Sequence, residues 1–95
     1  MIVSVAMITV KPGHQGPVAD ILNEHVNQEK KAPGCVKAYY KKAINSDDTF
    51  LVYVEYDNMQ SFQMTEKEAE KKKEEGKVEF VLRPHILKAF FGNFD

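Results

Sequence analysis

Two segments of this 95-residue chain carry apolar side chains on both of the faces that an extended backbone presents. In residues 2–10, one face holds Ile2, Ser4, Ala6, Ile8 and Val10, and the other holds Val3, Val5, Met7 and Thr9. Residues 49–56 repeat this pattern with Phe50, Val52, Val54 and Tyr56 on one face and Leu51 and Tyr53 on the other. We therefore predict two strands in a sheet that is covered on both sides, since a large exposed apolar face is typical of an interface.

A helix is predicted between these two strands. Its apolar stripe repeats at helical spacing and consists of Val18, Ile21, Leu22, His25 and Val26. Pro17 suits the first helical position, because the N–H that proline lacks is not needed there, and Pro33-Gly34 stops the helix. The predicted helix covers about Pro17–Lys31.

A hairpin is predicted after this helix. Residues 35–44 read as a strand with Tyr39 and Tyr40 at its centre, and the turn-forming residues 45–48 join it to the strand at 49–56. Asp57 or Asn58 then caps a second helix, and the Glu- and Lys-rich run at 66–77 is interpreted as a solvated helix face.

The last part of the chain is predicted to return to the sheet. Residues 77–83 indicate a further short helical piece, which Arg83-Pro84 ends. His85–Phe91 is predicted to be the last strand, and Gly92–Asp95 is expected to fray.

In chain order these elements form a single domain, 1–95, with the β-α-β-β-α-β order of the ferredoxin-like α+β fold. The predicted architecture is an antiparallel four-stranded sheet with both helices on one face. Two helices can cover only that face, so we expect the other face to pack against the sheet of a second copy as an isologous homodimer.

Charge and cysteine content exclude several classes of protein. The formal net charge of −1, from 13 basic and 14 acidic residues, gives no field to attract nucleic acid. Residues 1–10 are too short and wrongly flanked to be a membrane span or a signal peptide. The single cysteine, Cys35, cannot form an internal disulfide, which indicates a reducing cytoplasmic location.

Four sequence motifs resemble one known family. They are VKPG at residues 10–13, APGC at 32–35, DDTF at 47–50 and VEYDNMQSF at 54–62. With these motifs, residues 1–62 resemble the antibiotic biosynthesis monooxygenase (ABM) family of dimeric α+β barrels. The resemblance implies a sheet-to-sheet dimer with a small-molecule pocket between sheet and helices. It also implies chemistry without a cofactor on quinols or polycyclic phenols, in which the substrate anion reduces oxygen.

The chain departs from the family pattern at several positions. Tyr56 and Thr65 stand where many members have Trp and His, and Ala38 stands where an aromatic residue is common. Ala6 stands where the haem-degrading branch has Asn. Haem degradation is therefore the least favoured function.

His25 and Tyr56 are the candidate catalytic residues. The apolar stripe should direct His25 towards the sheet, where an imidazole can act as a general base, although a packing histidine with one hydrogen bond is the alternative. The phenol of Tyr56 can hydrogen-bond a substrate oxygen. The residues expected to bind the substrate are Met7, Tyr40, Phe62 and His85.

The remaining candidates are assigned structural roles. His14 is predicted to be a surface residue, and the spacing of the three histidines fits no metal motif, so no metal or other cofactor is expected. Cys35 has no activating neighbour in the sequence and is interpreted as structural. Because adjacent residues alternate faces, Tyr40 and Tyr56 should share one face, and Tyr39 and Tyr53 the other.

Two functions of different classes fit these residues. The first is a cofactor-independent monooxygenase acting on a small aromatic or quinol-type substrate. The alternative is a non-catalytic dimer of the same fold that binds a small apolar ligand or a partner protein, which the departures at Tyr56 and Thr65 favour.

Overall fold

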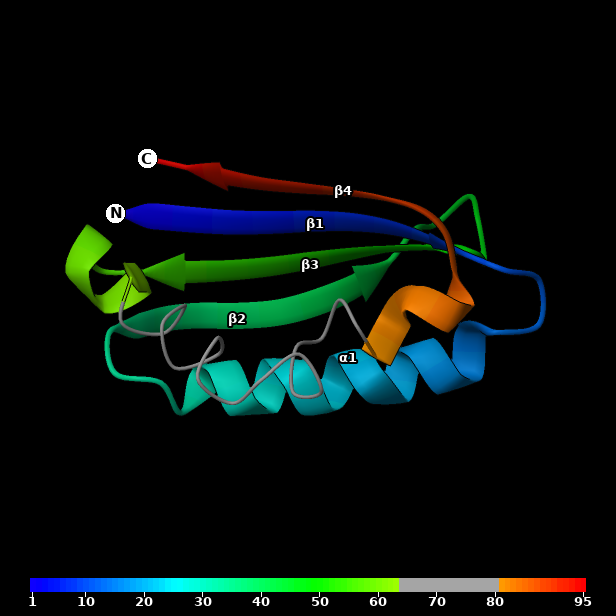
Figure 1. The fold of residues 1–95 in the computed structure, drawn as a ribbon, viewed down its shortest axis with the longest axis horizontal. Coiled ribbons are helices and arrows are strands. Elements are labelled where there is room, and N and C mark those ends of the chain that lie inside the picture. Colours follow the sequence, from blue (N-terminus) through cyan, green and yellow to red (C-terminus); the bar gives the residue numbers. More distant parts are fainter. Residues whose placement is uncertain (64–80) are drawn as a thin grey trace.

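The computed structural model describes residues 1–63 and 81–95, which form an antiparallel sheet with a long helix packed against it. The strands are β1 (Ile2–Val10), β2 (Cys35–Lys42), β3 (Thr49–Tyr56) and β4 (Ile86–Phe94), in the order β2-β3-β1-β4 (Figure 1). The helix α1 (Gln15–Lys30) connects β1 to β2, and the 3-10 helix η2 (Arg83–His85) leads into β4. The predicted ferredoxin-like α+β fold is confirmed.

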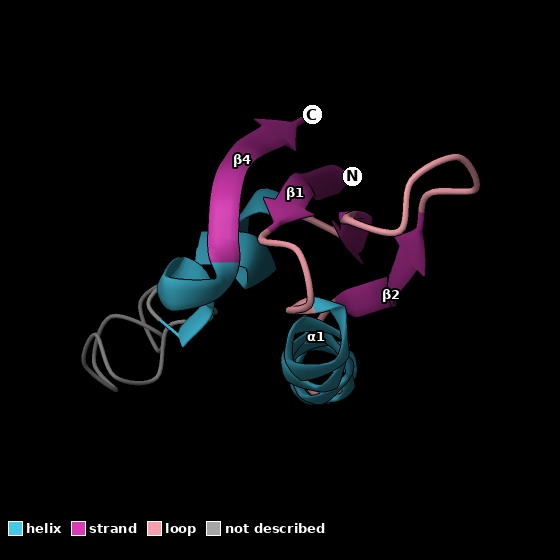
Figure 2. Ribbon diagram, turned by 90° about the vertical axis from the view of Figure 1, so that its right-hand side faces the viewer, coloured by secondary structure: helices cyan, strands magenta, loops and turns pink. Residues whose placement is uncertain are grey.

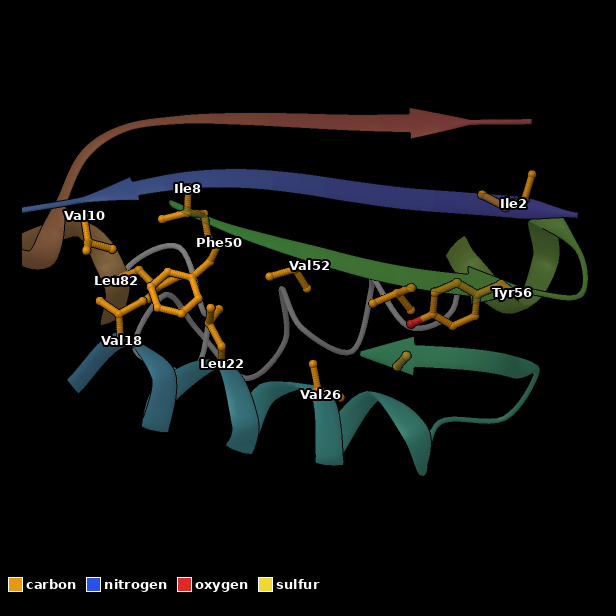
Figure 3. Close-up of a cluster of buried hydrophobic side chains, with 12 residues drawn as sticks. Ile2, Ile8, Val10, Val18, Leu22, Val26, Phe50, Val52, Tyr56 and Leu82 are labelled. Atoms are coloured by element: carbon orange, nitrogen blue, oxygen red, sulfur yellow. The ribbon is translucent and has the colours of Figure 1, made fainter. Parts of the chain in front are cut away.

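One face of the sheet is covered by helical segments, and we call it the covered face. Figure 2 shows α1 and η2 on the same side of the sheet. The buried stripe of α1 consists of Val18, Leu22 and Val26. It packs on buried sheet residues that include Ile8, Val10, Phe50, Val52 and Val54 (Figure 3). Each such side chain contributes about 1.5–3 kcal/mol by leaving water, so this layer stabilises the domain.

Strands β1 and β3 have the predicted bounds, but α1 begins two residues earlier than predicted. His14 is the residue before the helix, and its carbonyl oxygen accepts a hydrogen bond from the Val18 N–H at 3.2 Å. Pro17 is therefore the third helical residue. It fits there because the N–H groups of the first turn have no partner within the helix, so the missing N–H of proline costs nothing.

The predictions for the end of the chain were wrong in two respects. His85 belongs to η2 and not to a strand, and β4 continues to Phe94 instead of fraying after Phe91. Gly92 and Phe94 lie opposite Val5 and Val3 of β1. Pairing with β1, a strand near the centre of the sheet, holds residues 92–94 in extended form, although Gly92 and Asn93 have a weak preference for strands.

The segment after β3 is helical at residues 59–63. Asn58 caps it, as predicted, because its Oδ1 accepts a hydrogen bond from the Ser61 N–H at 2.8 Å. The Glu- and Lys-rich run and Thr65 lie outside the described residues. In the described part of the chain, no helix is both long enough and apolar enough to cross a membrane.

Candidate functional site

The last turn of α1 and the end of β3 bring a carboxylate and a phenol together on the covered face. The Tyr56 hydroxyl donates a hydrogen bond to Glu29 Oε2, and Tyr56 is only 2% exposed. Tyr56 points to this face because it alternates in step with the buried Val52 and Val54 of the same strand. Hydrogen bonds to an ionised group are roughly twice as strong as neutral ones, so Glu29 holds the phenol in one orientation.

His25 lies one helical turn before Glu29, on the same face of α1, since residues four apart are neighbours on a helix. His25 Nε2 is 3.8 Å from Glu29 Oε1, and the two side chains are 23% and 19% exposed. One carboxylate therefore contacts a phenol through one oxygen and faces an imidazole with the other. We call His25, Glu29 and Tyr56 the Glu29 cluster. A carboxylate in this position can orient the imidazole and stabilise the positive charge that it gains as a base.

Aromatic and backbone contacts surround Tyr56. The ring of Phe62 meets the ring of Tyr56 edge to face, with 5.7 Å between their centres. The turn before β2 closes on the same region, because the Asp57 N–H donates a hydrogen bond to the Gly34 oxygen at 2.9 Å.

Gly34 is required at this turn for two reasons. Its φ of +83° is in the left-handed region that favours glycine. A Cβ there would lie 2.8 Å from Asp57 Oδ1 and would overlap the side chain of Ser61. The Pro33-Gly34 sequence therefore ends α1 and also lets the 57–63 segment, which carries Phe62, approach the cluster.

Cys35 begins β2 directly opposite Tyr56. Burial raises the pKa of the Cys35 thiol, and the negative charge of Glu29 raises it further. The thiolate is the reactive form of cysteine, so both effects make Cys35 a poor nucleophile. This agrees with the structural role predicted from the sequence.

Three residues singled out in the sequence, His25, Tyr56 and Phe62, lie together in the structure. Met7 does not join them. It is 50% exposed and pairs with Leu51 on the face of the sheet away from α1, which we call the outer face. Met7 is thus separated from the Glu29 cluster by the sheet itself.

Tyr40 and His85 also lie away from the Glu29 cluster. Tyr40 shares the covered face with Tyr56, and the alternation predicts that the two share a face, but Tyr40 pairs with Val52, four residues and about 13 Å along β3 from Tyr56. His85 contacts His14 at the opposite end of α1. His14 precedes His25 by eleven residues, or about 16 Å of helix. His14 is half-buried rather than a plain surface residue.

Tyr39 and Tyr53 share a face, as the alternation predicts, and the structure shows that it is the outer face. Their rings stack with 5.1 Å between centres, and the Tyr53 hydroxyl donates a hydrogen bond to Glu55 at 2.7 Å. This hydrogen bond raises the pKa of Tyr53, so its phenol stays protonated. The four tyrosines are thus divided between the two faces.

The sequence reasoning missed Glu29. A signal for it exists, because Glu29 continues the stripe of α1 one turn after His25 and lies eleven residues after Val18. A charged residue in the last turn of a helix is usually solvated, however. Only the contact with Tyr56, 27 residues later, shows that Glu29 faces the sheet. In residues 1–63 and 81–95, no three His, Cys, Asp or Glu side chains form a group that could hold a metal ion.

The comparisons with known proteins give one family match and several solved structures of similar fold. The sequence model described as "Antibiotic biosynthesis monooxygenase" matches residues 1–76. None of the curated proteins matches the chain.

Solved structures of similar fold include a protein of Deinococcus radiodurans assigned to the antibiotic biosynthesis monooxygenases. It has a TM-score of 0.85 and 11% identity, covering 100% of this chain and 91% of that one. A similarly assigned protein of Nitrosomonas europaea has a TM-score of 0.82 and 11% identity, covering 100% and 97%. A variant of SnoaB from Streptomyces nogalater, described as a cofactor-independent oxygenase, has a TM-score of 0.82 and 14% identity, covering 99% and 90%. At these identities, the structures show a shared fold.

Proposed function

The chain belongs to the antibiotic biosynthesis monooxygenase family, and from this premise we propose that it is a cofactor-independent monooxygenase acting on a small aromatic or quinol-type substrate. The observation that carries the proposal is the Glu29 cluster, in which one carboxylate contacts the Tyr56 phenol and faces the His25 imidazole. The shared fold with SnoaB, itself described as a cofactor-independent oxygenase, supports the same reaction class.

His25 is the proposed general base. The side chain of histidine changes protonation state near neutral pH, so it can take the proton of an acidic phenol or enol and later return it. Glu29 Oε1, 3.8 Å from His25 Nε2, stabilises the resulting imidazolium. Tyr56 donates its only hydroxyl proton to Glu29, so its oxygen is the proposed acceptor for a hydroxyl group of the substrate, and the rings of Tyr56 and Phe62 suit an aromatic substrate.

The proposed reaction needs no oxidant other than oxygen. The deprotonated substrate gives electrons to O2, and one oxygen atom forms a bond to a substrate carbon. The second oxygen atom leaves as water with two hydrogens that the substrate loses, so that a quinol becomes a hydroxyquinone. The protein contributes deprotonation, orientation and exclusion of bulk water, which are tasks for a few side chains.

Oxygen consumption with a panel of quinols and polycyclic phenols tests the proposal. We expect turnover by the wild-type protein and a loss of about 10²-fold or more in kcat/KM for His25→Ala and Glu29→Gln, the usual contribution of general-base catalysis. Asn23→Ala is the matched control, because Asn23 is exposed on the same helix. No turnover of any member of the panel, or full activity of His25→Ala, would contradict the proposal.

A native mass spectrum of the purified protein distinguishes the alternative function. A bound small molecule that the protein does not turn over would identify a ligand-binding protein of the same fold.

The location proposed for either function is the cytoplasm. Cys35 is a free cysteine, and a free thiol stays reduced in that compartment.

A homodimer through the outer face is part of the same proposal. Met7, Phe90 and Phe94 are 50%, 56% and 54% exposed there, and Phe90 pairs directly with Met7 across β4 and β1. Large apolar side chains that lie together on one face are typical of an interface between proteins. A second copy of the chain would cover this face with an identical one.

A further inference from the structure

Two histidines that are 71 residues apart in the sequence meet at the end of α1 opposite to the Glu29 cluster. His14 Nδ1 lies 3.0 Å from His85 Nδ1, and the ring centres are 5.3 Å apart. At this distance one ring nitrogen must carry a proton and the other must accept the hydrogen bond. The pair is therefore complementary only while at least one imidazole is neutral.

Backbone hydrogen bonds hold both histidines in place. The Lys11 N–H donates to the His85 oxygen at 2.9 Å, and the His14 N–H donates to the Lys11 oxygen at 3.0 Å. The histidine pair thus links the loop between β1 and α1 to η2, which leads into β4 (Figure 1). Leu82, just before η2, is fully buried and lies near Val10 and Val18 at the same end of the core (Figure 3).

We propose that the His14–His85 pair is a pH-sensitive latch that holds η2 and the start of β4 against the loop between β1 and α1. A second proton on the pair turns the acceptor nitrogen into a donor and places two positive charges at hydrogen-bond distance. Imidazole gains its proton between about pH 5 and 8, so mild acid opens the latch.

Other charged groups surround the pair on the described elements. Lys11 lies in the loop between β1 and α1, Arg83 on η2 and Asp48 in the turn before β3. Lys11 and Arg83 carry the same charge as a doubly protonated pair would. The Asp48 carboxylate accepts a hydrogen bond from Nε2 of Gln15, the residue after His14, at 2.6 Å.

A double-mutant cycle of His14→Ala and His85→Ala tests the latch. At pH 7.5 each variant should lower Tm by about 4–8 °C, the effect of one net hydrogen bond of about 1 kcal/mol in a domain of this size. The double variant should fall no further than either single variant, because both remove the same interaction. At pH 5.0 this non-additivity should disappear. Additive effects at pH 7.5, or equal coupling at both pH values, would overturn the proposal.

Nitrogen NMR of the wild-type histidine rings tests the latch without any variant. At pH 7.5 one ring of the pair should carry its proton on Nδ1 and the other on Nε2, and below about pH 5 both rings should carry two protons. Protons on Nε2 of both rings at pH 7.5 would leave no donor between the two Nδ1 atoms and would refute the latch.

Discussion

Tyr56 and Tyr53 lie three residues apart on β3, on opposite faces of the sheet. On the covered face, the hydroxyl of Tyr56 is held by Glu29 from α1, and the residue is 2% exposed. On the outer face, Tyr53 donates to Glu55 of its own strand and stacks on Tyr39 of the adjacent strand. The covered face thus positions its phenol through a second layer of structure, whereas the outer face relies on contacts within the sheet.

The difference between the faces extends to their apolar residues. Ile8 and Phe50 are 1% and 2% exposed on the covered face, whereas Met7 and Phe90 are 50% and 56% exposed on the outer face. A face already covered by helices can hold a polar site that is shielded from water. A face that remains apolar and exposed is suited to a partner, so the two faces have separate roles in the proposed account.

Substitutions of two adjacent β1 residues give the largest expected contrast. Ile8→Ala should lower the free energy of unfolding by about 2–5 kcal/mol, because it leaves a cavity in the core. Met7→Ala should change it by about 0.5 kcal/mol or less in dilute protein, and by more as the concentration rises and dimers form. Denaturant unfolding at two protein concentrations measures both. Equal losses for the two variants at low concentration would break the distinction between the faces.

A lysine on the outer face should separate the proposed dimer. Phe90→Lys places charges in the interface and should raise the dimer dissociation constant at least about tenfold, which corresponds to 1.4 kcal/mol. Phe91→Lys is the matched control, because Phe91 pairs with Ala6 on the covered side. Sedimentation equilibrium should give twice the 10.9 kDa chain mass for wild type and Phe91→Lys. A wild-type monomer, or a dimer unaffected by Phe90→Lys, would contradict the proposed interface.

The smallest expected effect is on the thiol of Cys35, beside the Glu29 cluster. Its raised pKa means less thiolate at pH 8, so alkylation of Cys35 should be slower than that of a cysteine peptide. Glu29→Gln removes one cause of the shift and should speed the reaction by less than about tenfold, the factor for one pKa unit. The exposed Glu24→Gln on α1 is the control. Unchanged reactivity of Glu29→Gln would show that the carboxylate does not act on this thiol.

Most of the fold was predictable from local patterns. Runs of β-branched and aromatic residues mark β1 and β3, the Pro12-Gly13 turn follows β1, and the turn at 45–48 precedes β3, so the predicted bounds match. The end of β4 was missed because Gly92 and Asn93 have weak strand preference, and only pairing with β1 holds them extended. The start of α1 was missed because proline is tolerated throughout the first turn and not only at its first residue.

The candidate site was predictable only in part. The stripe of α1 pointed to His25, and the strand alternation grouped Tyr56 with Tyr40 without indicating which face of the sheet they share. Glu29 was missed because its role depends on a residue 27 positions away, and His14 because its partner is 71 positions away. Neither distance leaves a periodic signal in a single sequence.

The most direct test of the account compares Tyr56→Phe with Tyr53→Phe in oxygen consumption. Each variant loses one hydroxyl from the same strand, one on each face. With the quinol that the wild type turns over fastest, Tyr56→Phe should lower kcat/KM by about tenfold or more, the effect of one lost hydrogen bond of about 1.4 kcal/mol, and Tyr53→Phe should leave it unchanged. Equal activities of the two variants, or a larger loss for Tyr53→Phe, would contradict the placement of the site on the covered face.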